Sequence, residues 1–305
     1  MAKCLSFHAS YECRRSGACC SAGWSIPFNA GEQSRVETLS VVRGGIAITP
    51  DGAFAQMENG RCTFLLSGGG DHACAIHNAG GHAALPLPCR MFPRQVLHDP
   101  RGTFITLSHF CPTAAGLLFN DDEHSVGIMD APAALAGDGM LDGLDARETW
   151  PPLLRPGVMM DHHSFSVWER LAIEVLTRRG IGPRAALAAL HDATERLESW
   201  SPGSNVALER AVHDAFAAPL GPSPMLAPYD PAVKRWLAAR LFGSWIAYQG
   251  DALRTLVRFL RACHDVFVVE LARDGNAFQA IRRSDRLIVH ESASQRMATL
   301  LNDRS

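Results

Sequence analysis

The chain has 305 residues, of which 47% are hydrophobic and 20% charged, and its formal net charge at pH 7 is -2. This is the composition of an ordinary globular protein, and the small net charge gives no electrostatic basis for binding nucleic acid. No run of about 18 uncharged apolar residues occurs, so we expect no membrane span. The first residues lack an apolar segment behind a basic start, so we expect no secretory signal and a reducing, cytoplasmic location.

The most informative feature is the distribution of the 9 cysteines, because only Cys4 and Cys263 lie outside residues 13–111. Within that stretch the cysteines stand close to glycines and prolines, in contexts typical of turns. Thiolates in such positions are ligands for soft metals and for iron-sulfur clusters. We therefore expect a cysteine-rich metal domain in residues 1–120.

Three uses of these thiols compete, and we expect an iron-sulfur cluster first, a zinc site second and disulfides third. A structural zinc site usually contains Cys-x-x-Cys pairs, and this sequence has none. Disulfides suit oxidising compartments and small domains, whereas a chain of this length can bury a large core. The ligands of an iron-sulfur cluster can be spread over a long segment that the fold brings together.

The opening 30 residues are predicted to be rich in loops. Residues 23–28 alternate apolar and other residues, which indicates a short strand after Cys19 and Cys20. We expect Trp24 and Phe28 to pack over the thiols and to shield them from water. A helix is expected over residues 31–42, with Asn29 or Gly31 near its start.

The next cysteines lie in contexts that suit ligands. His77 follows Cys74 closely and is either a ligand, a hydrogen-bond donor to sulfur, or an ordinary surface histidine. Residues 103–108 have the composition of a strand, which would lead directly to His109 and Cys111. Cys111 precedes Pro112 and a run of small residues, so we expect it at the start of a helix, where the dipole favours the thiolate.

Cys89 stands among three prolines between residues 86 and 93, and we expect it in an extended, non-helical segment. Arg90 and Arg94 flank it. Their positive charges would offset the negative charge of several thiolates, although a solvated surface position is an equal alternative for both arginines.

Residues 121–160 are rich in Gly, Asp and Pro without a sustained period, and we expect a connector there. Residues 161–305 show helical periodicity, so the predicted fold is α+β, with a loop-rich cysteine domain followed by a mostly α-helical domain. The aromatic residues between Trp236 and Tyr248 are expected to pack between helices. Helices are predicted over residues 164–179, 184–200, 206–217, 231–248, 251–273 and within 276–301.

Five cysteine contexts recur in an order that resembles the FliB family of flagellin lysine-N-methylases and the wider YkgJ-type family of zinc- or iron-chelating cysteine-cluster proteins. The resemblance covers about the first 120 residues. These families commonly carry a further cysteine in the opening motif, where Ser16 and Ala18 stand here. The five contexts are Cys19-Cys20-Ser-Ala-Gly-Trp-Ser-Ile, Cys62-Thr-Phe-Leu, Cys74-Ala-Ile-His, Cys89-Arg-Met-Phe-Pro-Arg and Leu107-Ser-His-Phe-Cys111-Pro.

The resemblance implies a metal centre, an iron-sulfur cluster of the 4Fe-4S type, and transfer of methyl groups from S-adenosylmethionine to lysines of a protein substrate. In that setting Arg90 and Arg94 are candidates to pair with the carboxylate of the bound cofactor. The alternatives are a zinc- or iron-chelating protein without turnover and an iron-sulfur oxidoreductase. By position, the resemblance suggests as ligands Cys13, Cys19, Cys20, Cys62, Cys74, Cys89 and Cys111.

Overall fold

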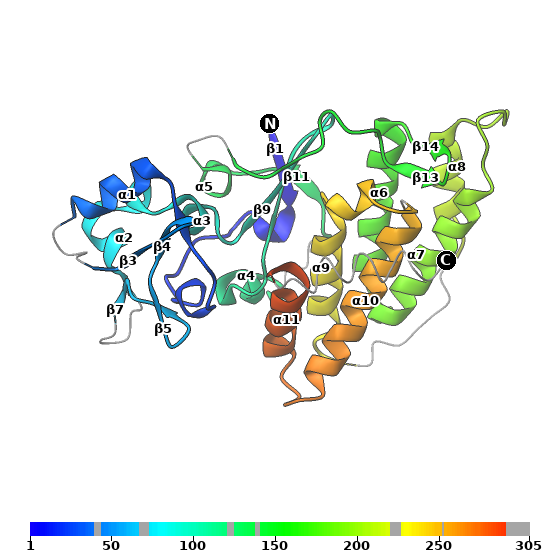
Figure 1. Ribbon diagram of the computed structural model, residues 1–305. Helices are drawn as coiled ribbons and strands as arrows, with labels where there is room; N and C mark the ends of the chain where they lie inside the picture. The colour runs from blue at the N-terminus through cyan, green and yellow to red at the C-terminus, as the bar shows by residue number, and fades with distance from the viewer. Residues whose placement is uncertain are drawn as a thin grey trace. The chain divides into compact units, whose positions relative to one another are not determined.

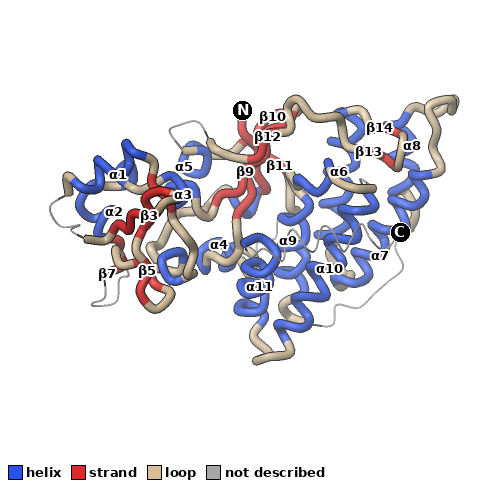
Figure 2. The backbone as a smooth tube through the Cα atoms, viewed as in Figure 1, coloured by secondary structure: helices blue, strands red, loops and turns tan. Residues whose placement is uncertain are grey.

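The structure is a computed structural model that describes residues 1–39, 44–66, 73–120, 125–137, 141–219, 227–251 and 253–290. The chain divides into two compact units. The helical unit comprises Met1–Tyr11, Gln95–Phe110 and Ala114–Ser305, and the cysteine unit comprises Glu12–Arg94 and Cys111–Thr113. Both helices and short strands are present, with helices dominating the later part of the chain (Figure 2), so the predicted α+β class is confirmed.

The helical unit contains a five-stranded sheet in the order β11-β1-β10-β9-β12. β1 pairs in parallel with β10, with Ala2 opposite Thr103, and antiparallel with β11. Aromatic and β-branched residues dominate the middle of β10, which explains its extended conformation and confirms the strand expected at residues 103–108. The strands are β1 (Ala2–Leu5), β9 (Arg94–Asp99), β10 (Gly102–Leu107), β11 (Ile128–Asp130) and β12 (Leu144–Asp145).

A layered bundle of helices makes up most of this unit (Figure 1). α6 packs against α7, α8 and α9, and α10 packs against α7, α9 and α11. Trp168 and Trp236 are fully buried in its core. The elements are η1 (Ser6–His8), α4 (Pro112–Leu117), α5 (Ala133–Ala136), β13 (Leu153–Arg155), β14 (Val158–Met159), α6 (His162–Thr177), α7 (Pro183–Glu198), α8 (Leu208–Phe216), α9 (Asp230–Leu241), η4 (Trp245–Tyr248), α10 (Leu253–Leu271), α11 (Ala277–Asp285) and η5 (Arg286–His290).

The predicted helices are present, and their ends have local causes. Asp161 caps α6 by accepting a hydrogen bond from the Ser164 backbone, and Pro183 occupies the first turn of α7. The single helix expected over residues 231–248 is wrong, because α9 ends at Leu241 and Gly243 adopts a left-handed φ of 56° before η4 begins. A Cβ atom on Gly243 would lie 2.7 Å from the Phe104 Cβ.

The compact units do not follow the expected boundaries at residues 120 and 160. β1 lies at the N-terminus, yet it belongs to the helical unit because it pairs with β10. β10 is in turn tied to α9, since the Thr106 hydroxyl donates to the Ala239 carbonyl at 3.2 Å. Residues 121–160, expected to be a connector, also contribute two strands to this sheet: β11 pairs with β1, and β12 pairs with β9.

The cysteine unit consists of short elements around a small core. β2, β4 and β3 form a three-stranded sheet, and β5 with β6 and β7 with β8 form two antiparallel pairs. Ile26, Phe28, Val36, Phe64 and Ile76 are buried at its centre. The elements are η2 (Cys19–Ser21), β2 (Pro27–Phe28), α1 (Ala30–Glu37), β3 (Ile46–Thr49), β4 (Gly52–Ala55), β5 (Met57–Glu58), β6 (Arg61–Cys62), β7 (Leu65–Leu66), β8 (Ala73–Cys74), α2 (Ala75–Gly80), η3 (His82–Ala84) and α3 (Leu87–Met91).

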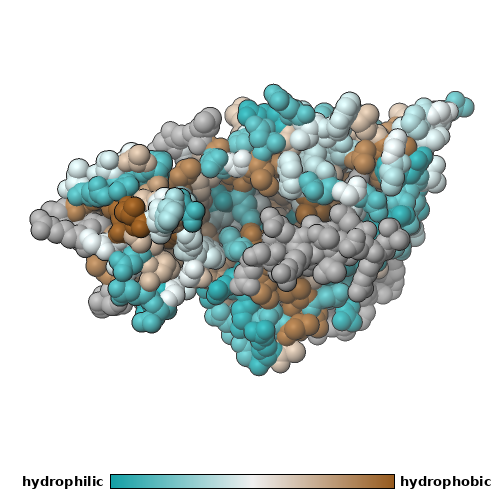
Figure 3. Space-filling view, viewed as in Figure 1, coloured by the Kyte–Doolittle hydropathy of each residue, from teal (hydrophilic) through white to brown (hydrophobic). Residues whose placement is uncertain are grey.

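Polar residues are spread over much of the face seen in Figure 3, and apolar residues form smaller areas between them. None of the helices in the described ranges combines the length and the apolar character needed to cross a membrane.

Candidate metal centre

Five cysteines from four separate segments of the cysteine unit gather around its core. Cys19 and Cys20 lie in η2, which packs against β6, and Cys62 is the last residue of β6. Cys74 ends β8 and Cys89 lies within α3. Cys62 belongs to the buried core of this unit, and Cys20, Cys74 and Cys89 pack against it. The fold therefore brings together residues that are up to 70 positions apart in sequence, Cys19 and Cys89 being the outer pair.

Cys19 and Cys20 form a close thiol pair with an Sγ to Sγ distance of 3.9 Å. A hydrogen bond from the Cys20 side chain lowers the pKa of Cys19 to about 7. The same hydrogen bond raises the pKa of Cys20, as do burial and the negative charges of the neighbouring thiols. The pair therefore loses its first proton near neutral pH and retains its second proton well above it. Cys19 is the residue that becomes the thiolate at neutral pH.

The remaining three thiols are held in their protonated form by burial. Burial raises the pKa values of Cys62, Cys74 and Cys89, and the negative charge of Cys19 adds to the increase in each case. Several buried thiolates are unfavourable together, and a bound cation would reverse this balance by stabilising the deprotonated form.

Backbone N–H groups partly oppose the effect of burial at two of these thiols. Those near Phe64 lower the pKa of Cys62, and those of Ile76 and His77 lower the pKa of Cys74, although burial outweighs them in both cases. At Cys74 this effect has a local cause, because Cys74 is the N-cap of α2 and precedes the first N–H groups of that helix, although its side chain makes no capping hydrogen bond. Backbone N–H groups near sulfur stabilise thiolates and tune iron-sulfur clusters.

The other two predicted ligands lie in the same unit but in different surroundings. Cys13 is exposed, in the loop before η2. Cys111 is buried and immediately precedes α4, which begins at Pro112, as the sequence predicted. The interactions described above thus join five of the seven predicted cysteines.

The expected extended conformation around Cys89 is wrong, because Leu87–Met91 form the short helix α3. Pro88 stands in the first turn, where proline is tolerated since no intrahelical N–H is needed. Arg90 Nη2 forms an ion pair with Glu32 Oε1 at 3.1 Å, and Arg94 Nη1 donates to the Arg90 carbonyl at 3.1 Å. Both arginines thus help to order the segment that carries Cys89.

Glu32 is the residue that sequence reasoning missed. It is 2% exposed, and its carboxylate accepts hydrogen bonds from the backbone of Asn29 and Leu87 and from Arg90. The signal was the spacing of Asn29 and Glu32, which is typical of a capping box, and the structure contains that box at the start of α1. Nothing in the spacing indicates that the same carboxylate also anchors α3.

Of the two aromatic residues expected to shield the thiols, Phe28 belongs to the same buried cluster as Cys62, whereas Trp24 packs against Phe92; shielding stays a prediction. The rings of Trp24 and Phe92 are 5.3 Å apart, and Phe28 is buried with its ring 6.4 Å from that of Phe64. His77 is partly exposed in α2, with its ring 6.2 Å from that of His82.

The donor chemistry fits a thiophilic metal, because the set is made of thiols with backbone N–H donors around them. In the described ranges, however, no three side chains of Cys, His, Asp or Glu already stand close enough to hold one metal ion. Ligation would therefore require the thiols to turn toward a common centre.

Comparison of the chain with family models, with curated proteins and with solved structures found no match.

Proposed function

We propose that the cysteine unit binds an iron-sulfur cluster, of the 4Fe-4S type, through ligands drawn from Cys19, Cys20, Cys62, Cys74 and Cys89. The observation that carries the proposal is the convergence of four thiols on one small core, in which Cys62 is buried and against which Cys20, Cys74 and Cys89 pack. The fifth thiol, Cys19, has its sulfur 3.9 Å from that of Cys20.

Two features favour a cluster over the alternative of zinc. A structural zinc site is closed by four ligands, often from Cys-x-x-Cys pairs, whereas here five thiols gather from four segments. Backbone N–H groups also favour the thiolate forms of Cys62 and Cys74, and such groups tune cluster potentials. Cys13 and Cys111 stay candidates for further ligands, because both lie in the cysteine unit.

The experiment that tests this assignment compares metal content among matched variants. We expect Cys20→Ser and Cys89→Ser to lose most of the bound metal and to unfold at a lower temperature. Cys263→Ser is the control, because Cys263 is fully buried in the helical unit, in α10. Equal metal content in all three variants would refute the assignment.

We further propose that the protein transfers methyl groups from S-adenosylmethionine to lysine side chains of a protein substrate, and this step rests on the FliB-like order of motifs. The reaction forms a bond between the lysine nitrogen and the methyl carbon and breaks the bond from that carbon to the sulfonium sulfur. The lysine must first lose a proton, because only the neutral amine has the electron pair needed.

Incubation with methyl-labelled S-adenosylmethionine and a candidate protein, followed by mass spectrometry of lysine peptides, tests this second step. We expect labelled methyl-lysine with the wild-type chain and none with Cys89→Ser. An intact metal centre without any binding of S-adenosylmethionine would favour an electron-transfer or metal-chelating role.

A further inference from the structure

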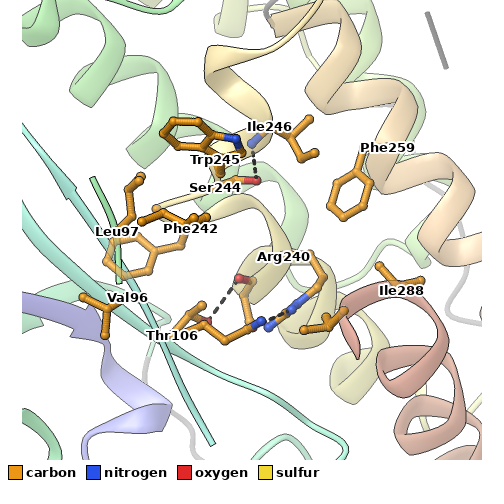
Figure 4. Close-up of a pocket in the computed structure, with 15 residues that line it drawn as sticks. Val96, Leu97, Thr106, Arg240, Phe242, Ser244, Trp245, Ile246, Phe259 and Ile288 are labelled. Carbon is orange, nitrogen blue, oxygen red and sulfur yellow. Dashed lines mark hydrogen bonds between the residues drawn. The ribbon is translucent and has the colours of Figure 1, made fainter. Parts of the chain in front are cut away.

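The helical unit contains a cavity of about 260 Å³ that is separate from the cysteine unit's thiols. Strands β9 and β10, helix α9, η4, α10 and η5 contribute to its walls. Most of the lining is apolar, and Figure 4 shows Leu97, Phe242, Trp245, Phe259 and Ile288 around it. A concave, mainly apolar site with a few polar groups is the usual form of a small-molecule pocket.

Arg240 is the only charged residue among the described residues that line this cavity. Its side chain is 5% exposed. Nη1 donates to Gln95 Oε1 at 2.8 Å and Nη2 donates to the Leu107 carbonyl at 2.7 Å. Nε is buried without a hydrogen-bond partner. Because a guanidinium carries five N–H hydrogens and Nη1 and Nη2 use one each in these bonds, both nitrogens keep one hydrogen for a further acceptor.

The charge of Arg240 is already balanced within the protein. Its Nε lies 3.6 Å from Oδ1 of Asp285, which is fully buried. The Asp285 carboxylate also accepts hydrogen bonds from Ser108 Oγ at 3.0 Å, from the His109 backbone at 2.7 Å and from Trp236 Nε1 at 2.9 Å. An anionic ligand beside Arg240 would therefore add an uncompensated negative charge to a buried region, which is costly.

The opposite side of the cavity is also partly polar. Figure 4 shows Ser244 and Trp245 across from Arg240 and Thr106. Ser244 Oγ accepts a hydrogen bond from the Ile246 backbone at 3.4 Å, and the Thr106 hydroxyl is engaged with the Ala239 carbonyl. The Ser244 hydroxyl keeps its hydrogen to donate, so the guanidinium is the main donor toward a ligand and Ser244 a second, weaker one.

We propose that this cavity binds an uncharged, mostly apolar small molecule that places one carbonyl or amide oxygen against Arg240. The apolar walls supply the burial of the hydrocarbon part, and the donors of Arg240 fix its orientation. The site does not depend on the metal centre proposed above, because every lining residue belongs to the helical unit.

Three matched probes of one skeleton test the proposal by calorimetry and ligand-observed NMR on the full chain: 3-phenylpropanamide, 3-phenylpropanoate and propylbenzene. We expect the amide to bind about tenfold more tightly than propylbenzene, since one hydrogen bond is worth up to about that factor, and at least about tenfold more tightly than the carboxylate, since an unpaired buried charge costs more. Equal or tighter binding of the carboxylate would overturn the proposal, as would no binding of any probe.

Two substitutions at one position locate the site. Ser244→Phe fills the cavity and removes the hydrogen bond to Ile246, whereas Ser244→Ala removes only that hydrogen bond. We expect the amide to bind Ser244→Ala within about twofold of wild type and Ser244→Phe at least about tenfold more weakly. If both variants bind like wild type while remaining folded by circular dichroism, the probe sits elsewhere and the assignment is wrong.

Discussion

Glu32 and Arg90 form an ion pair in the cysteine unit, with Glu32 Oε1 3.1 Å from Arg90 Nη2, and the same oxygen accepts a hydrogen bond from the Leu87 backbone at 2.8 Å. Glu32 belongs to α1, whereas Leu87 is the first residue of α3 and Arg90 is the last but one. One buried carboxylate therefore fixes the helix on which Cys89 stands.

Replacing Glu32 by Gln should loosen α3. The neutral amide keeps the size of the side chain but weakens its bonds to Arg90 and Leu87, and we expect a loss of about 1–3 kcal/mol in unfolding free energy together with reduced metal content. Glu37→Gln is the matched control, because Glu37 is exposed in the same helix. Chemical denaturation and metal analysis of the two variants check this, and equal behaviour would show that Glu32 has no such role.

The thiols should differ in reactivity when metal is absent. Because the pKa of Cys19 is lowered to about 7 by the Cys20 side chain, whereas burial raises those of Cys62 and Cys89, we expect iodoacetamide to modify Cys19 first at pH 7. Peptide mapping after short exposure measures the order. Faster modification of Cys62 or Cys89 than of Cys19 would contradict the arrangement of η2, and metal loading should protect all three.

The helical unit should lose stability in mild acid. Burial, followed by the positive charges of His109 and Arg240, lowers the pKa of His8 well below its usual value, and burial lowers that of His290 to about 4. Between about pH 6.5 and pH 4 the unfolded chain therefore binds protons that the folded chain excludes. The stabilisation is complete above pH 6.5 and is lost as pH falls.

Urea titrations at pH 7 and pH 5 measure this loss directly. We expect a lower midpoint at pH 5, and a smaller difference between the two pH values for His290→Asn, because one of the excluded protons is then gone. A midpoint that does not change between pH 7 and pH 5 would argue against the buried neutral histidines.

Asp285 should be the most sensitive carboxylate of the helical unit. Asp285→Asn leaves Arg240 without its counter-charge and weakens the bonds to Ser108 and Trp236, so we expect a loss of about 3–5 kcal/mol. Asp274→Asn is the control, since Asp274 is an exposed acid that pairs with Arg283. Thermal unfolding followed by circular dichroism compares the two, and similar midpoints would show that the Asp285 contacts contribute little.

Much of the fold was predictable because local patterns decide it. Apolar periodicity located the helices, the first-turn Pro183 located the start of α7, and the composition of residues 103–108 located β10. Features that depend on long-range contacts were not predictable. The pairing of β1 with β10 joins segments about 100 residues apart, with Cys4 opposite Ile105. Because of this pairing, the N-terminal strand belongs to the helical unit and not to the cysteine unit.

The candidate site was predictable in residue type but not in arrangement. The cysteine contexts identified the thiols that pack around the core of this unit. The conformation at Cys89 was not predictable, because prolines occur both in extended segments and in the first turn of a helix, where Pro88 stands. The second role of Glu32 is invisible in sequence because its partners are 55 and 58 residues away.

The central claim, a cysteine-ligated iron-sulfur cluster, is tested most directly by purifying the full chain without oxygen and measuring its visible absorbance together with iron and acid-labile sulfide. The account predicts a brown protein with broad visible absorbance and matching amounts of iron and sulfide, both lost in Cys20→Ser. A colourless protein that carries stoichiometric zinc, or no metal at all, would contradict it.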